Sequence, residues 1–239
     1  MTAGKLYLVP TPIGNLGDMT YRAVEVLNSV SKILAEDTRT TRVLLNHYQI
    51  DTRLESFHMH NEHGKLKFVI DELKSGLSIA QVSDAGTPGI SDPGFLLARA
   101  CSEQGIDIEV LPGATAFVPA LVKSGFALHQ FRFEGFLPQK KGRQTRILAL
   151  AANPDTTAFY ESPHKILKTL EQLNEACLPG RRVSVSREIS KKFEQTVTAT
   201  IAEVLLHFKQ HPPKGEFVVV LEGCDAKLGD IHTNEDDEN

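Results

Sequence analysis

Short apolar runs alternate with amphipathic runs along the first half of the chain. The apolar runs are four to six residues long, a length typical of buried strands in a parallel sheet. Between them, apolar residues recur at every third or fourth position, which predicts helices with one buried face. The expected strands are residues 5–9, 32–35, 54–57, 77–82 and 107–111. This alternation indicates a parallel, doubly wound α/β sheet.

The second half follows a different pattern. A phenylalanine-rich extended stretch at 131–136 precedes a polar, basic loop at 137–145. Further strands are expected at 157–160, 183–185, 195–200 and 216–221, with helices ending at 152 and spanning 165–176 and 202–208. Strands that follow one another without a helix between them predict a mixed α/β sheet. We therefore expect two domains, residues 1–125 and 126–224, linked near 124–130, and an acidic, disordered tail at 225–239.

The loop at 82–94 has the strongest ligand-binding pattern in the sequence. It follows an apolar run and precedes an amphipathic one, and it holds three glycines, two prolines and two aspartates. Glycine lets the backbone approach a ligand closely, and loops at the carboxyl ends of parallel strands bind ligands in open α/β sheets. A stiff connection without a ligand is the alternative.

Two further loops follow expected strands. Residues 10–18 are rich in glycine and proline, and Pro112-Gly113-Ala114-Thr115 opens a helix. Free backbone N–H groups at a helix start attract a carboxylate or phosphate. Thr115 is alternatively a simple N-cap. The chain contains neither the G-x-G-x-x-G fingerprint after its first strand nor a Walker A lysine motif.

These motifs together resemble the signature of the tetrapyrrole methylase superfamily, and in particular of its ribosomal RNA methyltransferases. The resemblance covers about residues 5 to 224 and implies S-adenosylmethionine as cofactor, held in a cleft between the two domains. It also implies methylation of the ribose 2′-hydroxyl of a cytidine in the decoding centre of small-subunit ribosomal RNA. The implied cofactor-binding residues are Pro10, Pro12, Asp84, Ala85, Gly86, Thr87, Pro112, Gly113, Thr115, Ala116 and Tyr160. Pro10 and Pro12 stand where other members often carry glycine.

A ribose hydroxyl is weakly acidic, so a carboxylate that orients or deprotonates it would help the transfer. The candidate catalytic residues are Asp37, Arg39, Glu161 and Glu188. Asp37 and Arg39 lie in a segment similar to a family motif, although acids at a helix start also stabilise the helix dipole. The sequence alone does not rank the three carboxylates.

A histidine-rich segment and two basic segments complete the candidate site. His58, His60 and His63 raise the alternative of a zinc site, but no cysteine or spaced partner motif accompanies them, and we expect no metal. The family has a similar segment, so it is read as facing the substrate. The expected substrate-binding residues are His60, Asn61, Glu62, Lys140, Lys141, Arg143, Arg187 and Lys191.

Charge and composition limit the partners only weakly. The net charge is −4, yet residues 126–224 carry +4 and residues 225–239 carry −5. A mildly basic second half permits RNA contact without predicting it. Three distant cysteines and the lack of a long apolar run favour a cytoplasmic protein. The resemblance further implies a homodimer. The resemblance also implies that many relatives carry an additional small helical domain after the catalytic core. We expect no counterpart of it in residues 225–239, so RNA would have to be bound by the two domains themselves.

Two rival functions remain open at this stage. The first is a methyltransferase of the same superfamily that acts on a tetrapyrrole or a modified protein side chain, because the cofactor motifs fit it equally well. The second is a non-catalytic RNA-binding assembly factor that has kept the fold. Methyl transfer to isolated ribosomal subunits would distinguish them.

Overall fold

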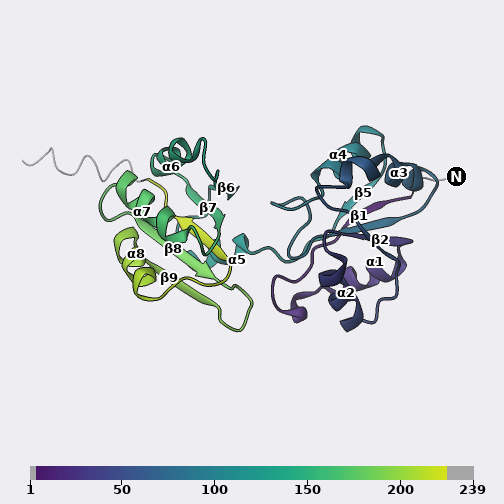
Figure 1. Ribbon diagram of the computed structural model, residues 1–239, viewed down its shortest axis with the longest axis horizontal. Helices are drawn as coiled ribbons and strands as arrows, with labels where there is room; N and C mark the ends of the chain where they lie inside the picture. Colours follow the sequence, from purple (N-terminus) through teal and green to yellow (C-terminus); the bar gives the residue numbers. More distant parts are fainter. Residues whose placement is uncertain (1–3, 225–239) are drawn as a thin grey trace, which may run out of the picture. The chain divides into compact units, whose positions relative to one another are not determined.

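The computed structural model describes residues 4–224, which form two compact units (Figure 1). The first unit ends at Thr115 and the second begins at Ala116. Each has its own five-stranded sheet and its own apolar core. The predicted fold class, a parallel α/β sheet followed by a mixed one, is confirmed.

The first sheet is entirely parallel, with strand order β3-β2-β4-β1-β5. Its strands are β1 (Leu6–Leu8), β2 (Lys32–Ala35), β3 (Leu54–Ser56), β4 (Ile79–Val82) and β5 (Ile108–Val110). Its helices are η1 (Leu16–Asp18), α1 (Tyr21–Ser29), α2 (Thr38–His47), α3 (Glu62–Lys74) and α4 (Phe95–Glu103). Every strand expected from the apolar runs is present, within one or two residues at each end.

Helices cover both faces of this sheet. Alternate strand residues point to opposite faces, so Leu34 packs in one cluster with residues of α3 and α4. Ile33 packs in another cluster with residues of α1 and α2. Figure 1 shows the two helix pairs on opposite sides of the strands. Short polar caps fix the helix starts: the Thr20 hydroxyl accepts from Ala23 N at 3.1 Å and begins α1.

The second sheet is mixed, with order β6-β7-β10-β8-β9. Only the β6–β7 pair is parallel. Its strands are β6 (Phe131–Phe136), β7 (Thr156–Glu161), β8 (Arg182–Arg187), β9 (Gln195–Thr200) and β10 (Phe217–Leu221). Its helices are α5 (Phe117–Ser124), α6 (Arg143–Ala151), α7 (Ile166–Ala176) and α8 (Ile201–Gln210). The central strand β10 is buried throughout, and residues of α6, α7 and α8 share its larger core cluster.

The segment 124–130 needs correction, because it is not a free linker. Phe126 is buried in a core cluster with Ala120 and Leu121 of α5 and with residues of β7 and β10. The Ser124 hydroxyl caps this turn by donating to Leu121 O and accepting from Phe126 N. The helix α5 therefore packs in the second unit, whereas the sequence reading had assigned it to the first. The expected acidic tail at 225–239 lies outside the described residues.

Candidate functional site

Three glycine-rich loops leave one edge of the first sheet. They follow β1, β4 and β5, which are adjacent parallel strands, so their carboxyl ends lie side by side. We call them the first loop (residues 9–17), the central loop (83–94) and the third loop (111–115). Open α/β sheets bind ligands at this edge.

Backbone hydrogen bonds join the first loop to the central loop. Thr11 and Gly86 exchange two bonds of 2.9 Å and form an isolated antiparallel bridge. The buried Thr11 hydroxyl donates to Ser83 O at 3.0 Å, and the Ser83 hydroxyl donates to Gly86 O at 3.0 Å. Gly86 has a φ of +83°, a left-handed conformation that side chains disfavour. The predicted special loops thus form one connected structure.

The third loop packs against both of the others. The Thr87 hydroxyl donates to Ala114 O at 3.1 Å. A Cβ at Gly113 would lie 2.5 Å from Pro10 Cβ, so only glycine permits this approach. Pro10 is buried, whereas Asp84, Ala85 and Gly113 are exposed. Where the three loops meet, the exposed surface therefore includes peptide backbone and the Asp84 carboxylate, which suits a polar ligand.

The other expected cofactor residues have varied positions. Pro12 and Thr115 are half-buried in the first unit. Ala116 is the N-cap of α5 and makes no side-chain cap, so the alternative reading of Thr115 as an N-cap is wrong. In the second unit, Tyr160 lies on β7, and its ring is 5.2 Å from that of Phe133 and 5.4 Å from that of Phe136.

A second group of polar residues follows β2, β3 and β4 at the same edge. Asp37 N donates to Asp84 Oδ1 at 3.0 Å and ties the ends of β2 and β4 together. The Arg39 side chain binds the Asp37 carboxylate, with Nη2 2.7 Å from Oδ2. The hydrogen bonds from the Arg39 side chain, together with those from the backbone of Arg39 and Thr40, lower the pKa of Asp37 to about 2. A carboxylate of such low basicity is a poor proton acceptor.

Glu36 has the opposite electrostatic environment. It follows β2 and is half-buried. Partial burial raises its pKa above the ordinary glutamate value, the nearby Asp84 charge raises it further, and His58 opposes the shift. A carboxyl with a raised pKa at a ligand edge is a typical proton acceptor. The sequence reading placed Glu36 in its motif but did not select it.

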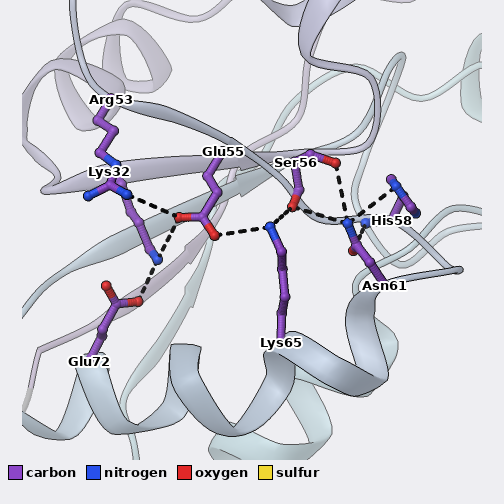
Figure 2. Close-up of polar contacts among 8 residues, drawn as sticks. All are labelled: Lys32, Arg53, Glu55, Ser56, His58, Asn61, Lys65 and Glu72. Carbon is purple, nitrogen blue, oxygen red and sulfur yellow. Dashed lines mark hydrogen bonds and ion pairs between the residues drawn. The ribbon is translucent and has the colours of Figure 1, made fainter.

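A polar network braces the histidine-rich segment (Figure 2). Lys32, buried on β2, lies 3.1 Å from Glu55 Oε2 and 2.5 Å from Glu72 Oε2. Lys65 Nζ donates to Glu55 Oε1 at 3.1 Å and to Ser56 O at 2.8 Å. The network therefore connects β2 and β3 to α3, and it fixes the point at which the chain leaves β3.

Asn61 organises the turn that follows β3. Its Oδ1 accepts from His58 N at 2.9 Å, and its Nδ2 lies 3.2 Å from the His58 ring. The expectation that Asn61 binds substrate is thus replaced by a positioning role, because its amide is engaged within the turn. His60 is exposed and Glu62 is half-buried at the start of α3. Within residues 4–224, no group of three or more His, Cys, Asp or Glu side chains is placed to hold a metal ion.

Two of the expected residues in the second unit form a buried ion pair instead. Arg143 Nη2 lies 3.1 Å from Glu161 Oε2, and both side chains are less than a tenth exposed. The Thr169 hydroxyl donates to the same oxygen at 2.6 Å, and Glu161 Oε1 accepts from Ser162 N. Arg143 also donates to Pro138 O. Arg143 therefore anchors the basic loop and does not present its charge to RNA. Both carboxylate oxygens of Glu161 already accept hydrogen bonds within the second unit.

The carboxylate of Glu188 is also engaged. Its Oε1 accepts from Glu216 N and from Lys191 Nζ, both at 3.0 Å. The bond from Glu216 N is the main cause of a lowered Glu188 pKa. Lys191 is correspondingly held between Glu188 and Glu216. Arg187 is half-buried, and its Nε has no hydrogen-bond partner among the described residues. Lys140 and Lys141, by contrast, are exposed as expected.

A model of the Tetrapyrrole (Corrin/Porphyrin) Methylases matches residues 5–205 of the chain. The chain belongs to this family. A protein of Synechocystis, named Ribosomal RNA small subunit methyltransferase I, is 49% identical over 92% of this chain and 80% of its own length. The protein of that name from Escherichia coli O157:H7 is 46% identical over 95% of this chain and 81% of its own length.

Solved structures of tetrapyrrole methylases and a related enzyme share the fold. Diphthine synthase aligns with a TM-score of 0.71 at 13% identity, over 92% of this chain and 90% of that one. Uroporphyrin-III C-methyltransferase from Thermus thermophilus, in complex with S-adenyl homocysteine, aligns with a TM-score of 0.64 at 17% identity. That alignment covers 91% of this chain and 97% of the other. The predictions of family and of a methyltransferase are confirmed.

The geometry of this tetrapyrrole methylase also identifies residues that the sequence reading missed. Lys32 is the only charged residue in an otherwise apolar strand, and that isolation was the available signal for a buried ion pair. Glu36 had no such signal, because its pKa is raised by partial burial and by the charge of Asp84, which follows a different strand. None of the helices within residues 4–224 is long and apolar enough to cross a membrane.

Proposed function

We propose that this chain transfers a methyl group from S-adenosylmethionine to the ribose 2′-hydroxyl of a cytidine in the decoding centre of small-subunit ribosomal RNA. One observation carries the proposal. Relatives named Ribosomal RNA small subunit methyltransferase I are 46–49% identical to this chain over more than nine tenths of its length. The proposed RNA substrate rests on those names, and the chemistry rests on the site of the first unit.

The three loops of the first unit fit S-adenosylmethionine. The Gly113–Pro10 contact leaves no room for a side chain, so peptide groups line the surface at that point. Asp84 adds a carboxylate that can accept hydrogen bonds from ribose hydroxyls. The loop residues proposed to hold the cofactor are Pro10, Pro12, Asp84, Ala85, Gly86, Thr87, Pro112, Gly113 and Thr115. Ala116 and Tyr160 belong to the second unit and stay sequence-based predictions. When bound, the cofactor supplies a methyl group attached to a sulfonium sulfur. That sulfur is a good leaving group, because it departs as a neutral thioether.

Glu36 is the proposed proton acceptor for the ribose hydroxyl. Its raised pKa makes it a stronger base than Asp37, whose pKa is about 2. Glu161 and Glu188 are unsuited, because Arg143 and Lys191 already neutralise them. Asp37 instead positions the chain through its backbone bond to Asp84. Orientation and exclusion of water are the remaining tasks of the protein.

The RNA backbone is proposed to contact exposed cations. The Arg39 side chain is 90% exposed even though it pairs with Asp37, so its guanidinium group is accessible to a phosphate. Lys140 and Lys141 are exposed on the loop that Arg143 anchors. His60, Glu62 and Arg187 stay proposed substrate contacts, whereas Asn61, Arg143 and Lys191 take positioning roles.

A homodimer stays a proposal as well. Light scattering at micromolar concentration tests it, and a monomeric mass would contradict it.

The decisive experiment supplies purified protein with methyl-labelled S-adenosylmethionine and small ribosomal subunits from a source that lacks the modification. We expect label in the small-subunit RNA and none in large subunits. A ribose 2′-O-methyl group blocks alkaline cleavage of the following linkage, so alkaline hydrolysis of the labelled RNA locates the site. Label on a base, on protein or on a tetrapyrrole would contradict the proposal. Glu36→Gln should abolish most of the labelling while cofactor binding persists.

A further inference from the structure

The turn between β8 and β9, residues 188–194, has a conformation that is costly to maintain. Glu188 and Ser190 have φ values of +51° and +66°, a left-handed region that residues other than glycine rarely adopt. Such strain persists only when the surroundings fix the chain. We call this segment the β8–β9 turn. Its anchors explain how the strain is held.

Glu188 fixes one side of the turn. Its backbone N donates to Glu216 O at 3.0 Å, and its carboxylate accepts from Glu216 N and from Lys191 Nζ. The carboxylate lies against Gly215, where a Cβ would be 2.4 Å from Glu188 Oε1. The loop before β10 is thus shaped to receive this carboxylate.

Glu194 and Ile189 fix the other side. The Glu194 carboxylate accepts from Ser190 N at 2.7 Å and from Lys123 Nζ of α5 at 2.6 Å. Ile189 packs against the core cluster that contains Ala120 and Leu121. Both acids of the turn, its aliphatic side chain and Lys191 are thus engaged with neighbouring segments, whereas the two consecutive residues 192 and 193 are exposed.

Those two residues are Lys192 and Phe193. The Phe193 side chain is 68% exposed, and Lys192 Nζ lies 5.7 Å from the centre of its ring. Within the described part of the chain, no acid forms an ion pair with Lys192. An exposed phenylalanine on a strained and anchored turn contributes little to folding, because its ring keeps most of its contact with water. The arrangement instead presents an exposed aromatic ring with the Lys192 ammonium over it.

We propose that Phe193 stacks on an unpaired base of the RNA substrate and that Lys192 contacts the adjacent phosphate. This inference rests on the proposed function and specifies how the RNA is held. Bases stack on aromatic side chains irrespective of sequence, and a neighbouring cation binds the backbone. A protein interface is less well matched, because Lys191, Lys192 and Glu194 adjoin Phe193 in the chain, and charged residues are depleted in the buried core of such interfaces.

The test measures binding to a labelled single-stranded RNA of about ten nucleotides and to small ribosomal subunits, at several salt concentrations. Phe193→Ala should weaken binding about tenfold, and Phe193→Leu should behave in the same way because it keeps apolar bulk but loses the ring. Phe193→Trp should restore wild-type affinity. Lys192→Ala should lower the salt dependence of binding by somewhat less than one counterion, about 0.7. Tyr21→Ala, at a 92% exposed aromatic residue of α1, is the matched control and should bind as wild type.

Each outcome decides the matter. Unchanged binding of Phe193→Ala overturns the proposal, and retained binding of Phe193→Leu replaces stacking with a general apolar contact. A change in oligomeric mass without a change in RNA affinity assigns the turn to a protein interface instead. The affinity for S-adenosylmethionine and the melting temperature of all variants should match wild type. If the wild-type protein labels no ribosomal RNA, the proposed function fails. If it labels RNA but the Phe193 variants bind normally, only the stacking proposal fails.

Discussion

The loops of the first unit and the expected catalytic carboxylates of the second unit are held in different ways. In the first unit, the ligand loops are shaped by backbone hydrogen bonds and by the contact of Gly113 with Pro10, and they leave Asp84 and Ala85 exposed. In the second unit, the carboxylates of Glu161 and Glu188 are neutralised by cations from neighbouring segments. Charged residues in a motif can therefore serve two purposes: under our proposal some face the ligand, and others hold the loops that do.

The buried pair provides the strongest test of this difference. Arg143→Ala leaves Glu161 buried without its partner, and we expect a loss of about 3–5 kcal/mol in the free energy of unfolding. Arg146→Ala, which removes a half-exposed pair with Glu134, should cost under about 1 kcal/mol and is the matched control. Urea unfolding measures both. The double variant Arg143→Met with Glu161→Leu should recover most of the stability. If Arg143→Ala lowers the free energy of unfolding by under about 1 kcal/mol, the pair behaves as an exposed one, and Arg143 would again be a candidate RNA contact.

Glu36 tests whether a carboxylate of the first unit acts in the chemistry. Glu36→Gln should lower kcat about a hundredfold, within the range for general bases, with little change in the affinity for S-adenosylmethionine. Because its folded pKa is raised, Glu36 binds its proton more tightly in the folded state. Stability should therefore fall slightly as pH rises through that pKa in wild type but not in Glu36→Gln.

The wild-type pH profile of kcat provides the accompanying control. The rate should decline on the acid side at a pH above the ordinary glutamate value, since only the ionised form accepts a proton. If Asp37 were the base, its pKa of about 2 would place the decline at a far lower pH. An acid limb near pH 2, or a Glu36→Gln variant with wild-type kcat, would identify another base.

Gly113→Ala tests the backbone-built loops. The new Cβ would clash with Pro10 Cβ at 2.5 Å, so the first and third loops must separate. We expect at least about a tenfold loss of affinity for S-adenosylmethionine in calorimetry. The corresponding free energy is comparable with the net contribution of one hydrogen bond. Gly64→Ala on α3, where a Cβ meets nothing within 4 Å, should bind normally. Equal affinities in the two variants would mean that these loops do not hold the cofactor.

The sequence predicted the fold more completely than the site, for physical reasons. Strand and helix patterns depend on local periodicity, so β2 at 32–35 and α7 at 166–176 were found close to their true bounds. The close contacts among the loops after β1, β4 and β5 were also predictable, because glycine and proline constrain the backbone locally, whereas the ligand of these loops stays a proposal. The partners of Arg143 were not, since Glu161 and Thr169 come from other elements. The raised pKa of Glu36 likewise depends on side chains that only the folded sheet brings together.

The smallest expected effect concerns the loop that Arg143 anchors. Lys140 and Lys141 are exposed there, whereas Arg143 is buried, so the RNA surface proposed for this loop has two cations and not three. Lys140→Ala with Lys141→Ala should reduce the salt dependence of RNA binding by about 1.4 to 1.8 counterions and weaken binding several-fold. Lys168→Ala with Lys214→Ala removes two exposed lysines of the same unit and should leave both quantities nearly unchanged. Filter binding across a salt series measures them. If the two double variants behave alike, the loop is only a solvated connection. Arg143 would then anchor a loop whose lysines do not contact RNA.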